Sequence, residues 1–156
     1  MPSEQWGEFP YTVLHFVISD ALSSDALSSD ALSIDLREKV SPDDIRALTR
    51  LGFEQVFGIL TAQNPMSLAQ TAARNEQLAN ELQREVAAMG VVCAPLDACS
   101  PDRSHCERSI AVAATCAELV ELARRYRQLA TFWFDGTSFW IIPAMSANDT
   151  VQLPLG

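Results

Sequence analysis

The spacing of apolar side chains along the chain predicts alternating strands and helices. Strands are indicated where β-branched and aromatic residues are frequent and the side chains on both faces of the strand are apolar. We expect strands at Pro10–Ile18, Glu54–Thr61, Val91–Ala94, Cys106–Ala113, Ala130–Phe134 and Thr137–Ile142. Asp135-Gly136 is a dipeptide typical of hairpin turns, so the last two strands should pair, with Trp133 near Ser138 and Phe132 near Phe139.

Three helices are predicted from their capping sequences. Ser41-Pro42 opens a short helix that Gly52 should end. Capping boxes, in which a Ser or Thr is followed three residues later by Gln or Glu, begin at Ser67 and Thr115. They predict the two long helices, Leu68–Met89 and Cys116–Gln128.

A polar residue interrupts the apolar stripe of the first long helix. The stripe, spaced alternately by four and three, is Leu68, Ala72, Asn75, Ala79, Leu82, Val86 and Met89. An amide on an apolar face needs hydrogen-bond partners. We expect Asn75 to reach the turn Thr61–Pro65, which follows the most apolar strand.

The order of elements predicts an α+β domain. From Glu54 onward it is strand, helix, strand, strand, helix, strand, which is the ferredoxin-like (split βαβ) pattern. The sheet should be mainly antiparallel with two long helices on one face, plus an N-terminal strand and short helix and a C-terminal hairpin. We expect a single domain over residues 1–156, with a loose arm at 1–9 and an irregular tail at 143–156. Three copies of Ser-Asp-Ala-Leu-Ser at residues 19–33 suggest an exposed, peripheral loop.

Composition narrows the classes of partner. The 156 residues carry a net charge of −9, and this acidic balance disfavours nucleic acid and anionic membranes, which need clustered Lys and Arg. No apolar run approaches the ~20 residues that span a bilayer. The start of the chain lacks a signal-peptide pattern, so we expect a cytoplasmic protein.

The four cysteines do not have zinc-site spacing. Cys93, Cys99, Cys106 and Cys116 contain no C-x-x-C pair. We expect free thiols, with Cys93 and Cys116 as small core residues. His105 beside Cys106 is too sparse a ligand set for a metal, and we expect neither a metal nor a cofactor.

The predicted topology gathers polar residues at one end of the sheet. The strand after Cys106 should run antiparallel beside the strand that ends at Thr61, so it begins where that strand ends. Thr61, Asn64, Asn75 and Gln128 then become ligand-binding candidates. His105 and Glu107, two residues apart in a strand, share a face and are candidates for acid and base.

The same segments carry a family resemblance. They are Thr61-Ala62-Gln63-Asn64-Pro65, Arg74-Asn75, the run Asp102–Ser109 (DRSHCERS) and Gln128-Leu129-Ala130. Together, within residues 10–142, they resemble the bacterial domain-of-unknown-function 3293 family, from which the triple repeat departs. Because no activity is established for that family, the resemblance implies a fold and a site location but no chemistry.

Three functions remain open. The first is a binding or regulatory module with a pocket for a small polar ligand, such as a nucleobase or carboxamide, or with a protein partner at Trp133 and Trp140. The second is an enzyme that uses His105 and Glu107 on a small polar substrate. In the third, the polar residues form a purely structural network.

Overall fold

The computed structural model describes residues 7, 9–16 and 32–156. Its helices are α2 (Pro42–Arg50), α3 (Ala72–Ala88) and α4 (Cys116–Arg125), with short 3-10 turns η1 (Phe9–Tyr11) and η3 (Pro65–Ser67). Its strands are β1 (Val13–Phe16), β2 (Leu32–Asp35), β3 (Phe57–Thr61), β4 (Cys93–Cys99), β5 (Cys106–Val112), β6 (Ala130–Phe134), β7 (Phe139–Pro143) and β8 (Val151–Gln152). Most of the repeat, residues 19–31, lies outside the described residues, but its last two residues begin β2.

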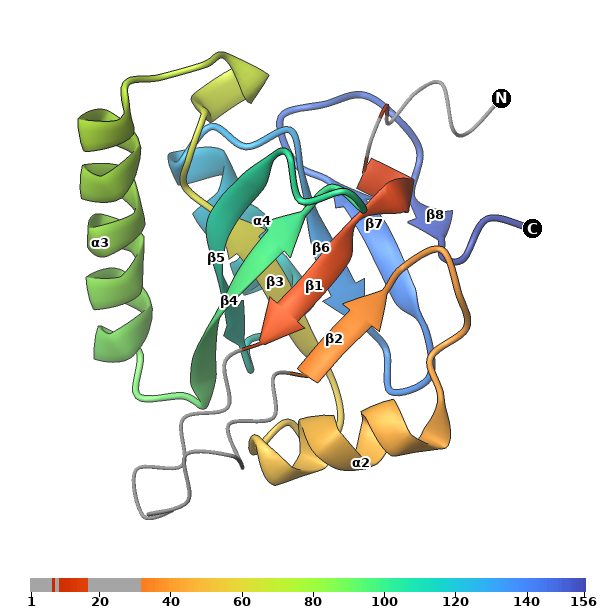
Figure 1. Cartoon of the computed structure of the whole chain (residues 1–156). Helices are drawn as coiled ribbons and strands as arrows, with labels where there is room; N and C mark the ends of the chain where they lie inside the picture. The colour runs from red at the N-terminus through yellow and green to blue at the C-terminus, as the bar shows by residue number, and fades with distance from the viewer. Residues whose placement is uncertain (1–6, 8, 17–31) are drawn as a thin grey trace.

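All described strands join one antiparallel sheet. The order is β2-β1-β4-β5-β3-β6-β7-β8, so β3 lies between β5 and β6. The sheet curls, and its β1–β2 end comes to lie across from β6 and β7 (Figure 1). A mixed α/β domain with an antiparallel sheet is thereby confirmed. The sheet of the described residues is larger than a four-stranded split βαβ sheet, and the ferredoxin-like assignment stays a prediction.

The two longer helices cover one face of the sheet. Leu82 and Val86 of α3 and Leu119 and Leu122 of α4 share one buried cluster with β3 and β5. Gly58 makes this approach possible, because a Cβ there would lie 2.3 Å from Leu119 Cδ2. A side chain at position 58 would therefore overlap the Leu119 side chain, so Leu119 would have to move.

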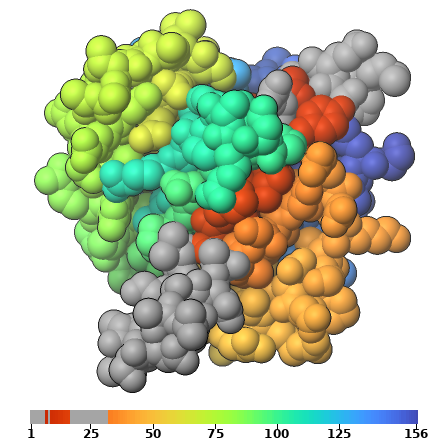
Figure 2. Space-filling view, in the orientation of Figure 1, coloured from red at the N-terminus to blue at the C-terminus, as the bar shows by residue number. Residues whose placement is uncertain are grey.

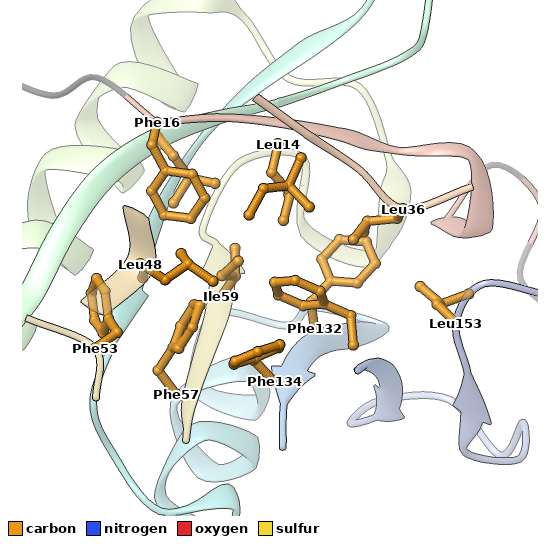
Figure 3. Packing of buried hydrophobic residues seen from close by; sticks show 14 of the residues in the cluster. Leu14, Phe16, Leu36, Leu48, Phe53, Phe57, Ile59, Phe132, Phe134 and Leu153 are labelled. Atoms are coloured by element: carbon orange, nitrogen blue, oxygen red, sulfur yellow. The ribbon is translucent and has the colours of Figure 1, made fainter. Parts of the chain in front are cut away.

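The opposite, concave face holds the larger part of the core. Figure 3 shows Leu14 and Phe16 of β1 facing Phe132 and Phe134 of β6 across this space. Leu48 of α2 is fully buried in the same cluster. Curling of the sheet thus lets its two ends bury apolar side chains against each other.

The first long helix begins later than the capping sequence at Ser67 predicts. Leu68, expected on the buried stripe, is 65% exposed, and Ser67 has a positive φ of 59°. The helix starts instead at Ala72, where the Thr71 hydroxyl accepts a hydrogen bond from the Arg74 amide. The caps at Ser41 and Thr115 are confirmed, each as a complete capping box.

Several strand boundaries also differ from prediction. No strand was predicted between residues 95 and 104, yet β4 continues to Cys99, because Ala94 and Leu96 are buried in the core and Ala98, on the same face of the strand, packs against it. The tail 143–156 was expected to be irregular, yet it supplies β8 and the buried Leu153. Conversely, β3 begins only at Phe57 and β1 only at Val13.

The β6–β7 hairpin forms, but in another register. Trp133 pairs with Trp140 and Phe134 with Phe139, so the turn spans Asp135 to Ser138. One oxygen of the Asp135 carboxylate accepts hydrogen bonds from the Thr137 and Ser138 amides, both at 2.8 Å. This carboxylate stabilises the longer turn in place of the predicted two-residue one.

The prediction of free thiols was wrong for Cys99 and Cys106, and the prediction of a core position was wrong for Cys93. Cys99 and Cys106 form a disulfide across the β4–β5 hairpin. Cys93 is exposed rather than in the core, whereas Cys116 is a partly buried free thiol.

No helix in the described ranges is long and apolar enough to cross a membrane.

Candidate functional site

A cavity of about 880 Å³ opens at the end of the sheet where β3 ends and β5 and β6 begin. Side-chain alternation explains its walls. Ile59 and Ala111 lie in the concave core, so Thr61 and Glu107, which share their parities on β3 and β5, turn to the same concave face. The cavity therefore continues the concave core toward solvent, on the face opposite α3 and α4. Figure 2 shows the β4–β5 hairpin (green) lying between α3 and β1 on one face of the molecule.

An amide pair stands at the centre of the site. The backbone N–H of Asn64 donates to Asn75 Oδ1 at 2.8 Å, and Asn75 Nδ2 donates back to Asn64 Oδ1 at 2.9 Å. Asn64 Nδ2 in turn donates to Glu107 Oε2 at 2.8 Å. The polar interruption in the α3 stripe thus holds Asn64, and Asn64 holds the carboxylate.

The turn that carries Asn64 has unusual backbone geometry. Asn64, Met66 and Ser67 all have positive φ, at 49°, 57° and 59°. Such conformations cost free energy for residues other than glycine, and they persist where surrounding contacts impose them. Here the contacts are the Asn64–Asn75 pair and a 2.7 Å hydrogen bond from the Met66 amide to the Arg127 carbonyl.

Gln63 connects the turn to the sheet, and sequence reasoning did not single it out. Its Oε1 accepts from the Arg108 amide at 3.0 Å, and its carbonyl accepts from Gln128 Nε2 at 3.0 Å. Thr61 Oγ1 donates to the Arg108 carbonyl at 2.7 Å. The sequence feature that could have pointed to Gln63 was its place inside the Thr61–Pro65 turn, between Thr61 and Asn64, which had already been selected.

Glu107 is the partly buried carboxylate of the site. Desolvation raises the pKa of its carboxyl group, while the hydrogen bond from Asn64 and the nearby His105 ring oppose that shift. His105 Nε2 lies 3.9 Å from Glu107 Oε2, and its side chain is 67% exposed. This distance is too long for a hydrogen bond, so His105 and Glu107 are neighbours without a formed proton-transfer contact.

The structure brings together all six residues that the sequence selected, but only five of them line the cavity. Thr61, Asn64, His105, Glu107 and Gln128 line the cavity. Asn75 does not line it, and both ends of its side-chain amide are bonded to Asn64. Their roles toward a ligand stay predictions.

Trp133 and Trp140, the residues suggested as a site for a protein partner, are both half-buried. Trp133 packs against the cluster under α3 and α4. Trp140 Nε1 donates to Asp135 Oδ2 at 2.7 Å. Neither side chain is a freely projecting anchor for a protein partner.

Among the described residues, two side-chain polar atoms are buried without a hydrogen-bond partner. They are His15 Nε2 and Thr131 Oγ1. The other ring nitrogen of His15 pairs with Ser33 Oγ at 2.9 Å. Thr131 shares its strand parity with Trp133, which packs on the helix side. Its hydroxyl therefore does not point to the concave face.

Fold and site together describe a small α/β domain with a polar cavity at one end of an antiparallel sheet. Residues 60–131 match the model of the family described as "Protein of unknown function (DUF3293)". This match confirms the family resemblance, and all four segments that suggested it lie within the matched residues. No curated protein and no solved structure matches the chain.

Proposed function

We propose that this protein is a binding or regulatory module that holds a small polar ligand in the cavity at the end of the sheet. The observation that carries the proposal is the cavity itself, about 880 Å³, with polar walls and an apolar floor. That size lies in the range of small-molecule pockets, roughly 300–1,000 Å³. The floor includes Phe9, Ile59 and Phe132, whereas Thr61 and Glu107 stand on the walls.

The polar residues divide between two tasks under this proposal. Asn75 and Gln63 hold the turn, and their polar atoms are occupied by protein partners. Glu107, His105 and Gln128 line the cavity and are the groups that meet the ligand. The planar amide and carboxylate groups suit a flat polar ligand such as a nucleobase or carboxamide.

The enzyme alternative rests on the buried carboxylate. A carboxyl group with a raised pKa in a cavity is a candidate acid or base, and His105 stands 3.9 Å from it. Against it, the pair lacks a direct hydrogen bond and a third group that orients it. We therefore place acid–base catalysis by His105 and Glu107 second. A cytoplasmic location and the ferredoxin-like arrangement likewise remain proposals.

The direct test is a fragment screen by ligand-observed NMR against the full chain and two tryptophan variants. Ala69 is exposed and lines the cavity, so Ala69→Trp should place an indole in it without disturbing the core. Ala87→Trp, on an exposed position of α3 away from the cavity, is the matched control. We expect planar polar fragments to bind the wild type and Ala87→Trp, and to lose binding in Ala69→Trp.

Two outcomes would contradict the proposal. If no fragment binds the wild type at millimolar concentration, the polar residues form a structural network only. If fragments bind Ala69→Trp as well as the wild type, they bind elsewhere on the molecule.

A further inference from the structure

The charges around the cavity are one-sided. Among its described lining residues, Glu107 is the one carboxylate, and neither Lys nor Arg lines it. The nearest arginine on β5, Arg108, turns to the other face of the sheet, where its guanidinium donates to Asn80 and Gln83 of α3. An anionic ligand in this cavity would find a carboxylate, and the His105 ring is the one described lining group that can carry positive charge.

The Glu107 carboxylate is only partly used by the protein. Its Oε2 accepts from Asn64 Nδ2 at 2.8 Å, whereas Oε1 has no hydrogen bond to any described residue. The side chain is 25% exposed, so water solvates it incompletely. A partly buried carboxylate with a vacant oxygen is stabilised most by an N–H donor that carries positive charge.

The apolar floor lies within the same cavity. Phe9, Ile59 and Phe132 line it together with Glu107, so one ligand can contact both. We propose that the cavity selects a ligand with a cationic amine or amidine group directed at Glu107 and a flat apolar body, and that it rejects carboxylates and phosphates. This inference rests on the proposed function and names the chemical class of its ligand.

Three probes of nearly equal size and different charge test the inference. Benzamidine is a cation, benzamide is neutral and benzoate is an anion. Titrations followed by protein NMR should give the lowest dissociation constant for benzamidine. It should lie below that of benzoate by about tenfold or more, because a hydrogen bond to a charged group contributes that much binding free energy.

Two matched variants identify the responsible charge. Glu107→Gln keeps the side-chain shape and should weaken benzamidine by about tenfold while leaving benzamide nearly unchanged. Glu121→Gln removes the same charge from an exposed position on α4 and should leave all three affinities unchanged. Circular dichroism of both variants verifies that they are folded.

The outcomes separate this inference from the proposed function. If benzoate binds the cavity as tightly as benzamidine, or if Glu107→Gln leaves benzamidine unaffected, the ligand class is wrong but the cavity is still a binding site. If none of the three binds at millimolar concentration, the ligand class falls. In that case the fragment screen with Ala69→Trp decides separately whether the cavity binds anything.

Discussion

At the scale of single residues, the site depends on one asparagine that holds another. Asn75 stands where the apolar stripe of α3 would otherwise continue, and its amide both accepts from and donates to Asn64. Asn64 has a positive φ, which asparagine tolerates better than most residues. The polar interruption thus has a structural purpose, which is to set the position of the turn and of the Glu107 carboxylate.

Removal of Asn75 should therefore destabilise the domain. Asn75→Ala leaves the Asn64 backbone amide and side-chain oxygen each without one partner, which costs about 1–3 kcal/mol. Asn80→Ala is the matched control, because Asn80 is exposed on the same helix and, among the described residues, its side chain bonds only the exposed Arg108. Its loss should stay within about 0.5 kcal/mol. Urea unfolding of both variants measures the difference, and equal losses would show that the amide pair does not hold the turn.

At the scale of elements, the connection between β3 and α3 is the least regular part of the site. A 3-10 turn and an extended segment separate the strand from the helix. The backbone N–H of Gln70 donates to Asn64 Oδ1 at 3.2 Å, and this hydrogen bond connects the segment to the site. The chain therefore forms the cavity rim before the helix begins.

The position of the helix cap can be tested by two alanine substitutions. Thr71→Ala removes the side-chain oxygen that accepts from the Arg74 amide and should cost about 1 kcal/mol. Ser67→Ala should cost much less, because no side-chain cap forms at that residue in the structure. Chemical unfolding compares the two, and a larger loss for Ser67→Ala would mean that the helix starts where the sequence pattern alone predicted.

This element also shows why sequence reasoning succeeded at two caps and failed at the third. Ser41 and Thr115 each have an acidic residue three positions on, and both capping boxes form. Ser67 has Gln70 at that spacing, but the Gln70 amide bonds to Asn64 instead. The competing partner comes from a turn earlier in the chain, and a local pattern contains no information about it.

At the scale of the whole molecule, topology assembles a site from segments that lie far apart in the chain. Antiparallel pairing of β3 with β5 sets Thr61 opposite Ser109, which brings Glu107 next to the Thr61–Pro65 turn. This pairing followed from element order, so the grouping of the polar residues was predictable. The cavity, the extra strand β8 and the disulfide were not, because they depend on how the ends of the sheet curl and pack.

The same scale explains which parts of the sheet escaped prediction. Segment 95–99 reads as polar because of Pro95 and Asp97, yet it is a strand since both neighbours, β1 and β5, pair with it. Pairing on both sides supplies backbone hydrogen bonds that outweigh a weak intrinsic preference. Tertiary pairing of this kind is invisible to a window of residues.

Amide chemical-shift mapping can show whether the end of the sheet holds a ligand, as we propose. Isotope-labelled protein of all 156 residues is titrated with the strongest binder from the fragment screen. We predict that the largest shifts fall on Thr61, Asn64, His105 and Glu107, with little change on α2 or on the β6–β7 turn. Shifts concentrated on the turn near Trp140, or an absence of saturable shifts at the cavity, would contradict it.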